Sequence, residues 1–221
     1  MSDANDKTSK DPVGVPKAVV SRLSLYLREL QHWQREGKET VSSTQLGKLL
    51  GFTDAQVRKD LAYFGQFGYP GIGYKCQELI DAIRSILGTD RSWPVALVGC
   101  GHLGRALMGY KGFQQQGFDI VAAFDSDPKK IGEPLGEMRI ADIKNFPEIA
   151  DKLSIRLVIL SVPATVAQRV AEALVDSGIT GILNFAPVTL SLPNHVRVIG
   201  VDLAIEFEQL AFAVVKGWTS Q

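Results

Sequence analysis

The chain has 221 residues, of which 45% are hydrophobic and 22% are charged, and its formal net charge is zero. These values are ordinary for a soluble globular protein, and the length allows one large domain or two small ones. Its two cysteines, Cys76 and Cys100, fit neither a disulfide framework nor a metal site, so we expect a reducing compartment and no metal. Residues 1–15 are polar and lack the apolar core of a signal peptide, and no apolar run is long enough to span a bilayer. The sequence therefore predicts a cytoplasmic protein with no membrane partner and with a disordered tail over 1–15.

Basic residues gather toward the N-terminus. Residues 1–75 hold 11 Lys and Arg against 8 Asp and Glu, so they carry +3 and the remainder carries −3. By itself this asymmetry decides nothing, but it fits a basic N-terminal module joined to an acidic domain.

Two short helices joined by a tight turn follow a longer amphipathic helix. Apolar residues recur at three- and four-residue steps over 17–34, which predicts the long helix. The segments 42–45 (Ser-Ser-Thr-Gln) and 53–56 (Thr-Asp-Ala-Gln) are each a capping box that opens a short helix. Only residues 51–53 separate these helices, and a three-residue turn with a glycine between two helices is typical of a helix-turn-helix.

A glycine-rich loop and a further helix complete this region. Four glycines and Pro70 punctuate 65–73, which predicts a short β-hairpin, the wing of a winged helix. Residues 76–87 have the apolar spacing of another helix, with Gly88 as its C-cap. The segment 89–92 is the expected linker to the rest of the chain.

The second short helix presents a cationic face. Its apolar residues fall on one side of a helical wheel, whereas Arg58 and Lys59 fall on the other side between two alanines. A charged face without bulk can approach a DNA groove closely, and arginine can read guanine with two hydrogen bonds. The alternative is a solvated face beside Asp60, which is the commoner meaning of an isolated Arg-Lys pair. The capping boxes, the tight turn and the glycine-rich loop favour DNA binding.

The expected DNA contacts come from the starts of the three predicted helices and from the cationic face. Hydroxyl and backbone N–H groups over 43–45 could bond phosphate at a helix N-terminus. The expected DNA-binding set is Lys17, Ser43, Thr44, Gln45, Gln56, Arg58, Lys59 and Tyr63.

Beyond the linker the pattern changes to alternating strands and helices. Short β-branched runs predict strands at 95–98, 120–124, 157–162, 182–184 and 196–201, with helical stretches at 103–116, 142–153 and 164–177 between the earlier ones. This alternation predicts an α/β fold with a Rossmann-type, doubly wound parallel sheet. The last segment, 203–216, predicts a helix that is apolar more than halfway round and therefore needs a second surface to bury against.

A glycine-rich turn links the first of these strands to a helix. Gly99, Gly101 and Gly104 form the pattern G-x-G-x-x-G directly after the strand 95–98. In this pattern the first glycine permits the tight turn, the second leaves room for a pyrophosphate, and the third lets helix and strand pack closely. The turn in this context predicts a dinucleotide site.

The identity of the dinucleotide depends on an acid at the end of the next strand. Asp125 lies 21 residues after Gly104, where a carboxylate can accept both ribose hydroxyls and repel a 2′-phosphate. Ser126 and Asp127 supply no compensating cation, so we expect NADH or NAD⁺ rather than the 2′-phosphorylated forms. CoA-binding domains share this architecture, which leaves the nucleotide class open at this point.

Residues for catalysis are not evident. His32, His102 and His195 lie near no proton partner in the sequence, and the serines and cysteines lack a nucleophile-elbow context. A dehydrogenase needs a positioned acid or base and cations for its substrate. We therefore expect a sensor that binds the nucleotide without turning it over. The alternatives are an NAD-dependent oxidoreductase and a CoA-binding ligase subunit, each with a helical dimerisation module.

The sequence resembles the Rex family of redox-sensing transcriptional repressors, from Val15 to Trp218. The residues that carry the resemblance are SRLSLYLREL (21–30), TQLGKLLG (44–51), QVRKDLAYFGQFG (56–68), GIGY (71–74), ALVGCGHLG (96–104), FDSDPKKIG (124–132), ILNFAPV (182–188) and LAFAV (210–214). The resemblance implies a homodimer that represses transcription on palindromic operator DNA and is released when NADH binds. It also implies that the terminal helix is swapped between the two chains.

The resemblance adds residues to the nucleotide site and to a switch. Arg28, Tyr110 and Asp202 match a family network that links the two chains and responds to the redox state of the nicotinamide. Leu203 departs from the aromatic residue that some members have there, which leaves a stacking contact with the ring in doubt. The implied nucleotide-binding set is Gly99, Cys100, Gly101, His102, Leu103, Gly104, Asp125, Ser161, Val162, Pro163, Asn184, Phe185, Ala186, Pro187 and Tyr110.

Four parts of the chain follow from these predictions. The tail 1–15 precedes a winged helix-turn-helix domain over 16–88, an NAD(H)-binding domain over 89–202 and a swapped helix over 203–221.

Overall fold

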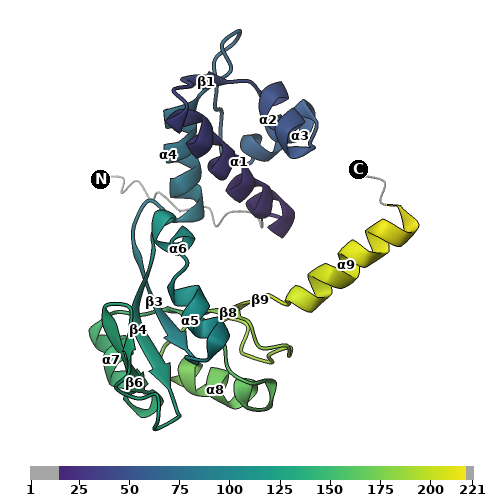
Figure 1. The fold of residues 1–221 in the computed structure, drawn as a ribbon. Coiled ribbons are helices and arrows are strands. Elements are labelled where there is room, and N and C mark those ends of the chain that lie inside the picture. The colour runs from purple at the N-terminus through teal and green to yellow at the C-terminus, as the bar shows by residue number, and fades with distance from the viewer. Residues whose placement is uncertain (1–14, 218–221) are drawn as a thin grey trace, which may run out of the picture. The chain divides into compact units, whose positions relative to one another are not determined.

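The computed structural model describes residues 15–217, and the chain divides into two compact units between Asp90 and Arg91. Figure 1 labels the helices and strands of both units. Residues 1–14 of the expected N-terminal tail and residues 218–221 at the end of the expected swapped helix lie outside the described residues. Each unit has a hydrophobic core of its own, and each is described by itself below.

The first unit is helical, with one small sheet. Leu23, Leu30 and Ile83 are completely buried in its core, together with Leu46 and Val57 of the two short helices. The elements in chain order are α1 (Lys17–Arg35), β1 (Thr40–Val41), α2 (Ser43–Leu50), α3 (Asp54–Ala62), β2 (Tyr74–Lys75) and α4 (Cys76–Leu87).

The helix-turn-helix has the expected bounds, but one of its two capping boxes is incomplete. Ser42 Oγ accepts the backbone N–H of Gln45 at 3.1 Å, and Gln45 Oε1 accepts that of Ser42 at 2.8 Å, which completes the first box. At α3, Thr53 Oγ1 accepts the backbone N–H of Gln56 at 3.1 Å. The reciprocal bond is missing because the Gln56 side chain donates to Asp60 instead. The second capping box was therefore only half right.

The wing is smaller than a hairpin of two strands. One antiparallel bridge between Tyr69 and Gly73 closes the loop, and β2 beyond it pairs with β1. This pairing was not predicted, because it joins two-residue strands that lie more than 30 residues apart in the chain. A side chain on Gly73 would place its Cβ 2.5 Å from the carbonyl oxygen of Val41, so the close pairing requires glycine there.

The second unit contains a seven-stranded sheet in the order β5-β6-β4-β3-β7-β8-β9. All neighbours pair in parallel except β5 with β6. The order reverses between β4 and β7 on either side of β3, as in the doubly wound dinucleotide-binding fold. The strands are β3 (Trp93–Val98), β4 (Phe118–Asp125), β5 (Pro134–Leu135), β6 (Met138–Asp142), β7 (Leu157–Leu160), β8 (Gly181–Asn184) and β9 (Arg197–Gly200).

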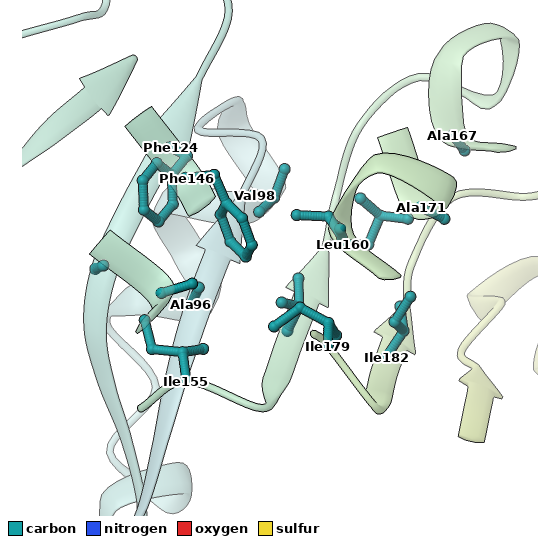
Figure 2. Close-up of a cluster of buried hydrophobic side chains, with 14 of the residues drawn as sticks. Ala96, Val98, Phe124, Phe146, Ile155, Leu160, Ala167, Ala171, Ile179 and Ile182 are labelled. Atoms are coloured by element: carbon teal, nitrogen blue, oxygen red, sulfur yellow. The ribbon is translucent and has the colours of Figure 1, made fainter. Parts of the chain in front are cut away.

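Helices cover both faces of this sheet. Phe146 of α7 and Ala171 of α8 pack with Phe124 and Leu160 on one face, as Figure 2 shows. On the other face, Leu107 of α5 packs with a second buried cluster. The helices are α5 (His102–Met108), α6 (Gly112–Gln115), α7 (Phe146–Lys152), preceded by the 3₁₀ turn Ile143–Asn145, and α8 (Ala164–Asp176).

One prediction for this unit was wrong, and one hairpin was missed. The helix expected over 103–116 is interrupted after Met108, where two glycines within four residues weaken helix formation. The hairpin of β5 and β6 was missed, because only Ile140 of β6 is buried and no β-branched run marks the strand. β6 nevertheless pairs in parallel with β4 and so completes the first half of the fold.

The C-terminal helix α9 (Leu203–Lys216) has the predicted bounds, and none of its residues is buried within this chain. Phe207 is 71% exposed and Val214 is 78% exposed. Large apolar side chains usually line the face of a helix that packs on the protein core. On α9 they are exposed, so this helix carries a large apolar surface that has no partner in its own chain. Among the described residues, no helix combines the length and the apolar character needed to cross a membrane.

Candidate dinucleotide site and DNA-reading face

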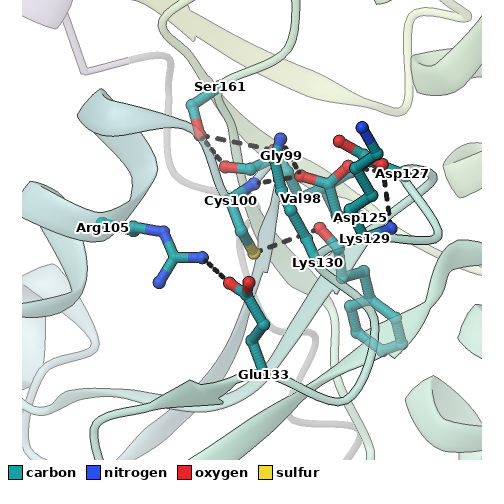
Figure 3. A network of polar contacts seen from close by, with 11 residues as sticks. Val98, Gly99, Cys100, Arg105, Asp125, Asp127, Lys129, Lys130, Glu133 and Ser161 are labelled. Atoms are coloured by element: carbon teal, nitrogen blue, oxygen red, sulfur yellow. Dashed lines mark hydrogen bonds and ion pairs between the residues drawn. The ribbon is translucent and has the colours of Figure 1, made fainter.

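The glycine-rich turn between β3 and α5 has the geometry that its sequence predicts. Gly99 has φ +96°, and a Cβ there would lie 2.4 Å from the carbonyl oxygen of Ser161 on the loop after β7. A Cβ on Gly104 would lie 2.1 Å from the carbonyl oxygen of Gly99, so α5 packs directly on the turn. Ser161 Oγ donates to that same oxygen at 2.8 Å, which ties the turn to the neighbouring loop (Figure 3).

Gly101 differs from the other two glycines because the space into which a Cβ would project is open. Beyond the adjoining residues of the chain, no atom lies within 4 Å of a Cβ built there, and Gly101 lines a cavity of about 970 Å³. A side chain at this position would project into space that a ligand needs. The open cradle and the size of the cavity fit a dinucleotide.

This cavity brings together eight of the predicted nucleotide-binding residues. It lies at the carboxyl ends of β3, β4 and β7, beside the point where the strand order reverses, where doubly wound folds bind ligands. The eight are Gly99, Gly101, His102, Leu103, Asp125, Ser161, Val162 and Pro163. Three cations that were not predicted also line it, namely Lys130, Lys144 and Arg169.

Asp125 is almost completely buried at the end of β4 and is held in place by its neighbours. The carboxylate accepts the backbone N–H groups of Cys100 and Asp127, each at 2.9 Å, and lies 3.0 Å from the ammonium of Lys130. Burial acts to raise the pKa of Asp125, but these three donors outweigh it, so the pKa lies below its ordinary value. The side chain is therefore a carboxylate near neutral pH.

Lys130 corrects the argument made from the sequence about the 2′-phosphate. Ser126 and Asp127 supply no cation, but Lys130 lies in the loop five residues after Asp125 and reaches back to the carboxylate (Figure 3). Lys130 and Cys100 occupy one carboxylate oxygen and Asp127 donates to the other, so one acceptor position is left, enough for one ribose hydroxyl rather than two. The signal in the sequence was the pair of lysines in FDSDPKKIG, to which no role was assigned.

Cys100 lies in the turn, but its side chain points away from the cavity. The thiol is completely buried and donates to the carbonyl oxygen of Phe124 at 3.4 Å. Burial and the nearby Asp125 carboxylate raise the pKa of this thiol to about 11. Cys100 therefore contributes its backbone N–H to the site rather than a nucleophile.

The predicted residues from the end of β8 onward and the predicted tyrosine do not line this cavity. The Asn184 amide donates to the carbonyl oxygens of Ala186 and Val188 and accepts the backbone N–H of Ala186, so it shapes the loop 184–188. Tyr110 is 60% exposed and packs edge-on against Phe113. Contacts of Asn184, Phe185, Ala186, Pro187 and Tyr110 with a nicotinamide remain predictions.

The cationic face of α3 is exposed, as predicted. Val57 and Leu61 point into the core of the first unit, whereas Arg58 and Lys59 are exposed on the opposite side. Arg58 forms an i,i+4 ion pair with Asp54 at 2.8 Å and also donates to Ser43 Oγ at 3.1 Å. Both partners lie at the surface, so these contacts are weak and DNA could replace them.

The side chains of the other predicted DNA contacts differ in their exposure and in the hydrogen bonds that they already make. Lys17 and Thr44 are exposed, and Tyr63 is 49% exposed. Two amides are already engaged, because Gln45 closes the capping box at Ser42 and Gln56 donates to Asp60. Lys17, Ser43, Thr44, Gln45, Gln56, Arg58, Lys59 and Tyr63 stay predicted DNA contacts.

A buried carboxylate in α3 was missed at the level of sequence. Asp60 is completely buried and forms an ion pair with Arg22 of α1, so it does not belong to a solvated face. It lies three residues after the inward-pointing Val57, and an acid on the apolar side of a helical wheel was the signal that could have revealed it.

The three residues of the implied redox switch each make local contacts in this chain. Arg28 pairs with its neighbour Glu29 at 3.0 Å, a contact within α1. Asp202 accepts the backbone N–H of Ala204 at 2.9 Å and caps α9. A network that links Arg28, Tyr110 and Asp202 across two chains stays a prediction.

Two family models match the chain, one in each unit. The model described as "Putative DNA-binding protein N-terminus" matches residues 14–62, and the model described as "CoA binding domain" matches residues 90–188. The first covers α1 to α3, and the second begins just before β3 and includes the glycine-rich turn.

Curated proteins are similar to the chain over nearly its whole length. The redox-sensing transcriptional repressor Rex of Pelotomaculum thermopropionicum is 45% identical over 202 residues, which cover 91% of this chain and 95% of that protein. The protein of the same name from Carboxydothermus hydrogenoformans is 46% identical over 200 residues, with coverages of 90% and 96%.

Solved structures agree with these relatives. RSP in complex with β-NAD⁺ and operator DNA has a TM-score of 0.87 and 32% identity, and the match covers 91% of this chain and 93% of that one. RSP in complex with β-NADH has a TM-score of 0.83 and 30% identity, with coverages of 90% and 94%, and RSP is described as a Rex-family repressor. The identity and coverage of these relatives show that the chain belongs to the Rex family of redox-sensing transcriptional repressors.

Proposed function

We propose that this repressor binds palindromic operator DNA as a homodimer and leaves it when NADH binds, so that transcription follows the cellular ratio of NADH to NAD⁺. RSP has been crystallised with β-NAD⁺ and operator DNA together, and also with β-NADH. These complexes support a nucleotide that acts as a regulatory ligand.

One observation carries the proposal: a single chain combines an exposed cationic face on a capped helix with a dinucleotide cavity. Arg58 and Lys59 provide the face, and the turn from Gly99 to Gly104 provides the cavity. We assign DNA binding to residues 16–88 and nucleotide binding to 89–202. Because the two ligands use different units, NADH must act on DNA binding through the geometry of the protein rather than by blocking a shared site.

The helix α9 supports the homodimer. Apolar side chains from Leu203 to Val215 are exposed within one chain, and a helix of this composition needs a covering surface. We assign residues 203–221 to an arm that packs on a second copy of the chain. The exchange of identical arms satisfies both apolar surfaces at once, which makes swapping a low-cost route to a dimer.

The two enzymatic alternatives find little support in the cavity. Its histidine, His102, lies in the glycine-rich turn, and Asp125 is held as a carboxylate by three donors. Arg58 and Lys59 serve neither an oxidoreductase nor a CoA ligase. The relatives are repressors, and this protein is a regulator rather than an enzyme.

We place the protein in the cytoplasm, where operator DNA and the NADH pool are both accessible. The free thiols of Cys76 and Cys100 suit this reducing compartment.

The decisive experiment compares three ligands in one DNA-binding assay. The wild-type protein selects its duplex from a random pool, and its affinity for that duplex is then measured with saturating NADH, NAD⁺ or CoA. We expect NADH to weaken binding strongly, and NAD⁺ and CoA to have little effect. Equal affinities with NADH and NAD⁺ would contradict redox sensing, and release by CoA alone would favour the CoA-binding alternative.

A further inference from the structure

The recognition helix α3 is anchored to α1 through one fully buried carboxylate, Asp60. Arg22 donates to it twice, from Nε at 2.6 Å and from Nη2 at 2.8 Å. Tyr26 Oη donates at 2.8 Å, and Gln56 Nε2 donates at 2.7 Å. Each carboxylate oxygen thus accepts two hydrogen bonds, so the hydrogen-bonding capacity of Asp60 is filled.

The donors come from two helices, and the turn between α2 and α3 packs against them. Arg22 and Tyr26 lie one turn apart on α1, and Gln56 lies one turn before Asp60 on α3. Phe52 of the turn packs edge-on against the Tyr26 ring at 6.2 Å, and the Arg22 guanidinium lies 5.9 Å from the Phe52 ring. We call Asp60, Arg22, Tyr26 and Gln56 the Asp60 network.

Packing alone would not require this network. Apolar side chains of similar size hold two helices together as well as a buried ion pair does, and often better. A charged pair with two bonds from one guanidinium differs in that it accepts only one geometry. The network therefore limits how α3 can rotate and slide on α1, beyond what the apolar contacts of Val57 and Leu61 impose.

The network also fixes a side chain that the DNA is expected to meet. Gln56 lies among the predicted DNA contacts, and one of its amide N–H groups is committed to Asp60. Arg58 and Lys59 are exposed and take no part in the network. Loss of Asp60 would therefore leave Arg58 and Lys59 available to DNA. It would also remove the bonds that fix the orientation of α3 and of the Gln56 amide.

We propose that Asp60 is a positioning residue for DNA recognition, which holds the α3 reading face and the Gln56 amide in the one arrangement that matches the operator. This inference rests on the proposed function. It separates two contributions to binding: the cations attract any duplex, whereas the Asp60 network supplies discrimination between sequences.

The test measures affinity for two duplexes, one that the wild-type protein selects from a random pool and one with the same base pairs in scrambled order. The variants are Asp60→Asn, which keeps the shape of the side chain, and Tyr26→Phe, which keeps the ring against Phe52 and removes one donor. Asp81→Asn is the matched control, because Asp81 is an exposed acid of α4 whose carboxylate accepts only from Gln77 among the described side chains. Thermal unfolding sets a temperature at which each variant is folded.

We expect Asp60→Asn to lose about tenfold in affinity for the selected duplex, the size of one lost base contact, and to keep its affinity for the scrambled one. Tyr26→Phe should show a smaller loss of the same kind, and it carries the test if Asp60→Asn does not fold. The dependence of scrambled-duplex binding on salt concentration should stay unchanged, because the number of phosphate contacts is unchanged.

Two results would overturn the positioning role: folded variants with wild-type discrimination, or equal losses for both duplexes. A purely structural Asp60 would lower the unfolding temperature and leave the discrimination of the folded protein intact. Failure of the proposed function has a different signature, since the wild-type protein would then fail to select a duplex, or Arg58→Ala would bind the selected duplex normally.

Discussion

The Lys130 ammonium lies 3.0 Å from Asp125 Oδ2 and neutralises the acid that would otherwise repel a 2′-phosphate. The two residues therefore act in opposite directions on the preference for NADH over NADPH. Asp125→Ala should weaken NADH binding and reduce the difference in affinity between NADH and NADPH. Lys130→Met should increase this difference, since an uncompensated carboxylate repels the 2′-phosphate of NADPH more strongly.

Calorimetric titration with both nucleotides measures this preference. We expect Lys130→Met to increase the ratio of the NADPH to the NADH dissociation constant by about tenfold, the effect of roughly 1.4 kcal/mol. Lys129→Met is the matched control, because Lys129 precedes Lys130 and is exposed. An unchanged ratio in Lys130→Met, or equal affinities for NADH and NADPH in the wild-type protein, would rule out this pair as the specificity determinant.

The cations of α3 should contribute to DNA affinity without contributing to folding. Arg58 pairs only with surface partners, so its removal leaves no buried charge behind. Arg58→Ala and Lys59→Ala should each cost about 1–3 kcal/mol of operator binding if they contact bases. Thermal unfolding should be nearly unchanged.

A substitution that is expected to strengthen DNA binding serves as the control for Arg58. Asp54→Asn removes the carboxylate that competes with DNA for the guanidinium, so binding of the operator should become tighter. The assay is fluorescence anisotropy of labelled duplex at fixed salt concentration. If Arg58→Ala and Lys59→Ala bind operator as tightly as the wild type, α3 does not present the reading face.

Elements with strong local signals were predicted well from the sequence. The helices α4 and α9 have the predicted bounds, because a glycine ends the first and the apolar pattern of the second is continuous. The pairing of β1 with β2 and the strand β6 were missed, since their stability comes from contacts between distant segments rather than from local pattern.

In the candidate sites, too, features with a local sequence pattern were predicted and contacts between separate segments were not. The glycine-rich turn and Asp125 follow from a motif with fixed spacing, and they meet in one cavity. The partners of buried charges do not follow from spacing. Arg22 lies 38 residues from Asp60, and Lys130 reaches Asp125 through the shape of its loop. The sequence marks the lysines after Asp125 and the acid on the apolar side of α3, but the donor that each carboxylate pairs with follows only from the fold.

Asp60 should make the stability of the protein sensitive to acid. Burial acts to raise the pKa of Asp60, but hydrogen bonds from Arg22, Tyr26 and Gln56 outweigh it, so the pKa in the folded state lies below its ordinary value. A depressed pKa stabilises the fold at pH values above the unfolded pKa of about 3.9, and this stabilisation is lost as pH falls through the folded pKa.

Chemical unfolding at a series of pH values tests this linkage. The free energy of unfolding of the wild type should fall as the pH drops below about 4. The same curve for Asp60→Asn should start lower at neutral pH and should fall less steeply in acid, since the variant has no carboxylate to protonate there. Parallel curves would show that other acids, such as Asp125, dominate the acid sensitivity.

The apolar surface of α9 should hold the dimer together. Phe207 and Leu210 are 71% and 54% exposed, so their replacement leaves the core of the chain intact. The double variant Phe207→Glu, Leu210→Glu should run as a folded monomer in size-exclusion chromatography with light scattering. The control Glu206→Gln, Glu208→Gln alters charge on the same helix and should stay dimeric. A monomeric wild type, or a dimeric Phe207→Glu, Leu210→Glu variant, would exclude α9 as the interface.

Asp202 offers the sharpest test of the redox switch, provided that its role as a helix cap is kept. Its carboxylate caps α9, so Asp202→Ala would also lose about 1 kcal/mol of helix stability and confuse the result. Asp202→Asn retains a capping oxygen and removes the charge.

Oxidised nicotinamide is cationic and reduced nicotinamide is neutral, so a carboxylate near the ring could pair with the oxidised ring or with Arg28 and Tyr110. Two exclusive pairings supply the bistable element that a switch needs.

A ligand shifts this equilibrium only by its difference in affinity for the two states. A coupling of about 1–3 kcal/mol changes operator affinity roughly 5–150-fold, and operator DNA must weaken NADH binding by the same factor. We expect Asp202→Asn to keep the fold and NADH binding but to lose most of this coupling, whereas Glu206→Gln on the same helix should keep it. The measurement is operator affinity at saturating NADH and at saturating NAD⁺ for all three proteins. An undiminished NADH effect in Asp202→Asn would leave redox sensing in place and remove the Asp202 charge from its mechanism.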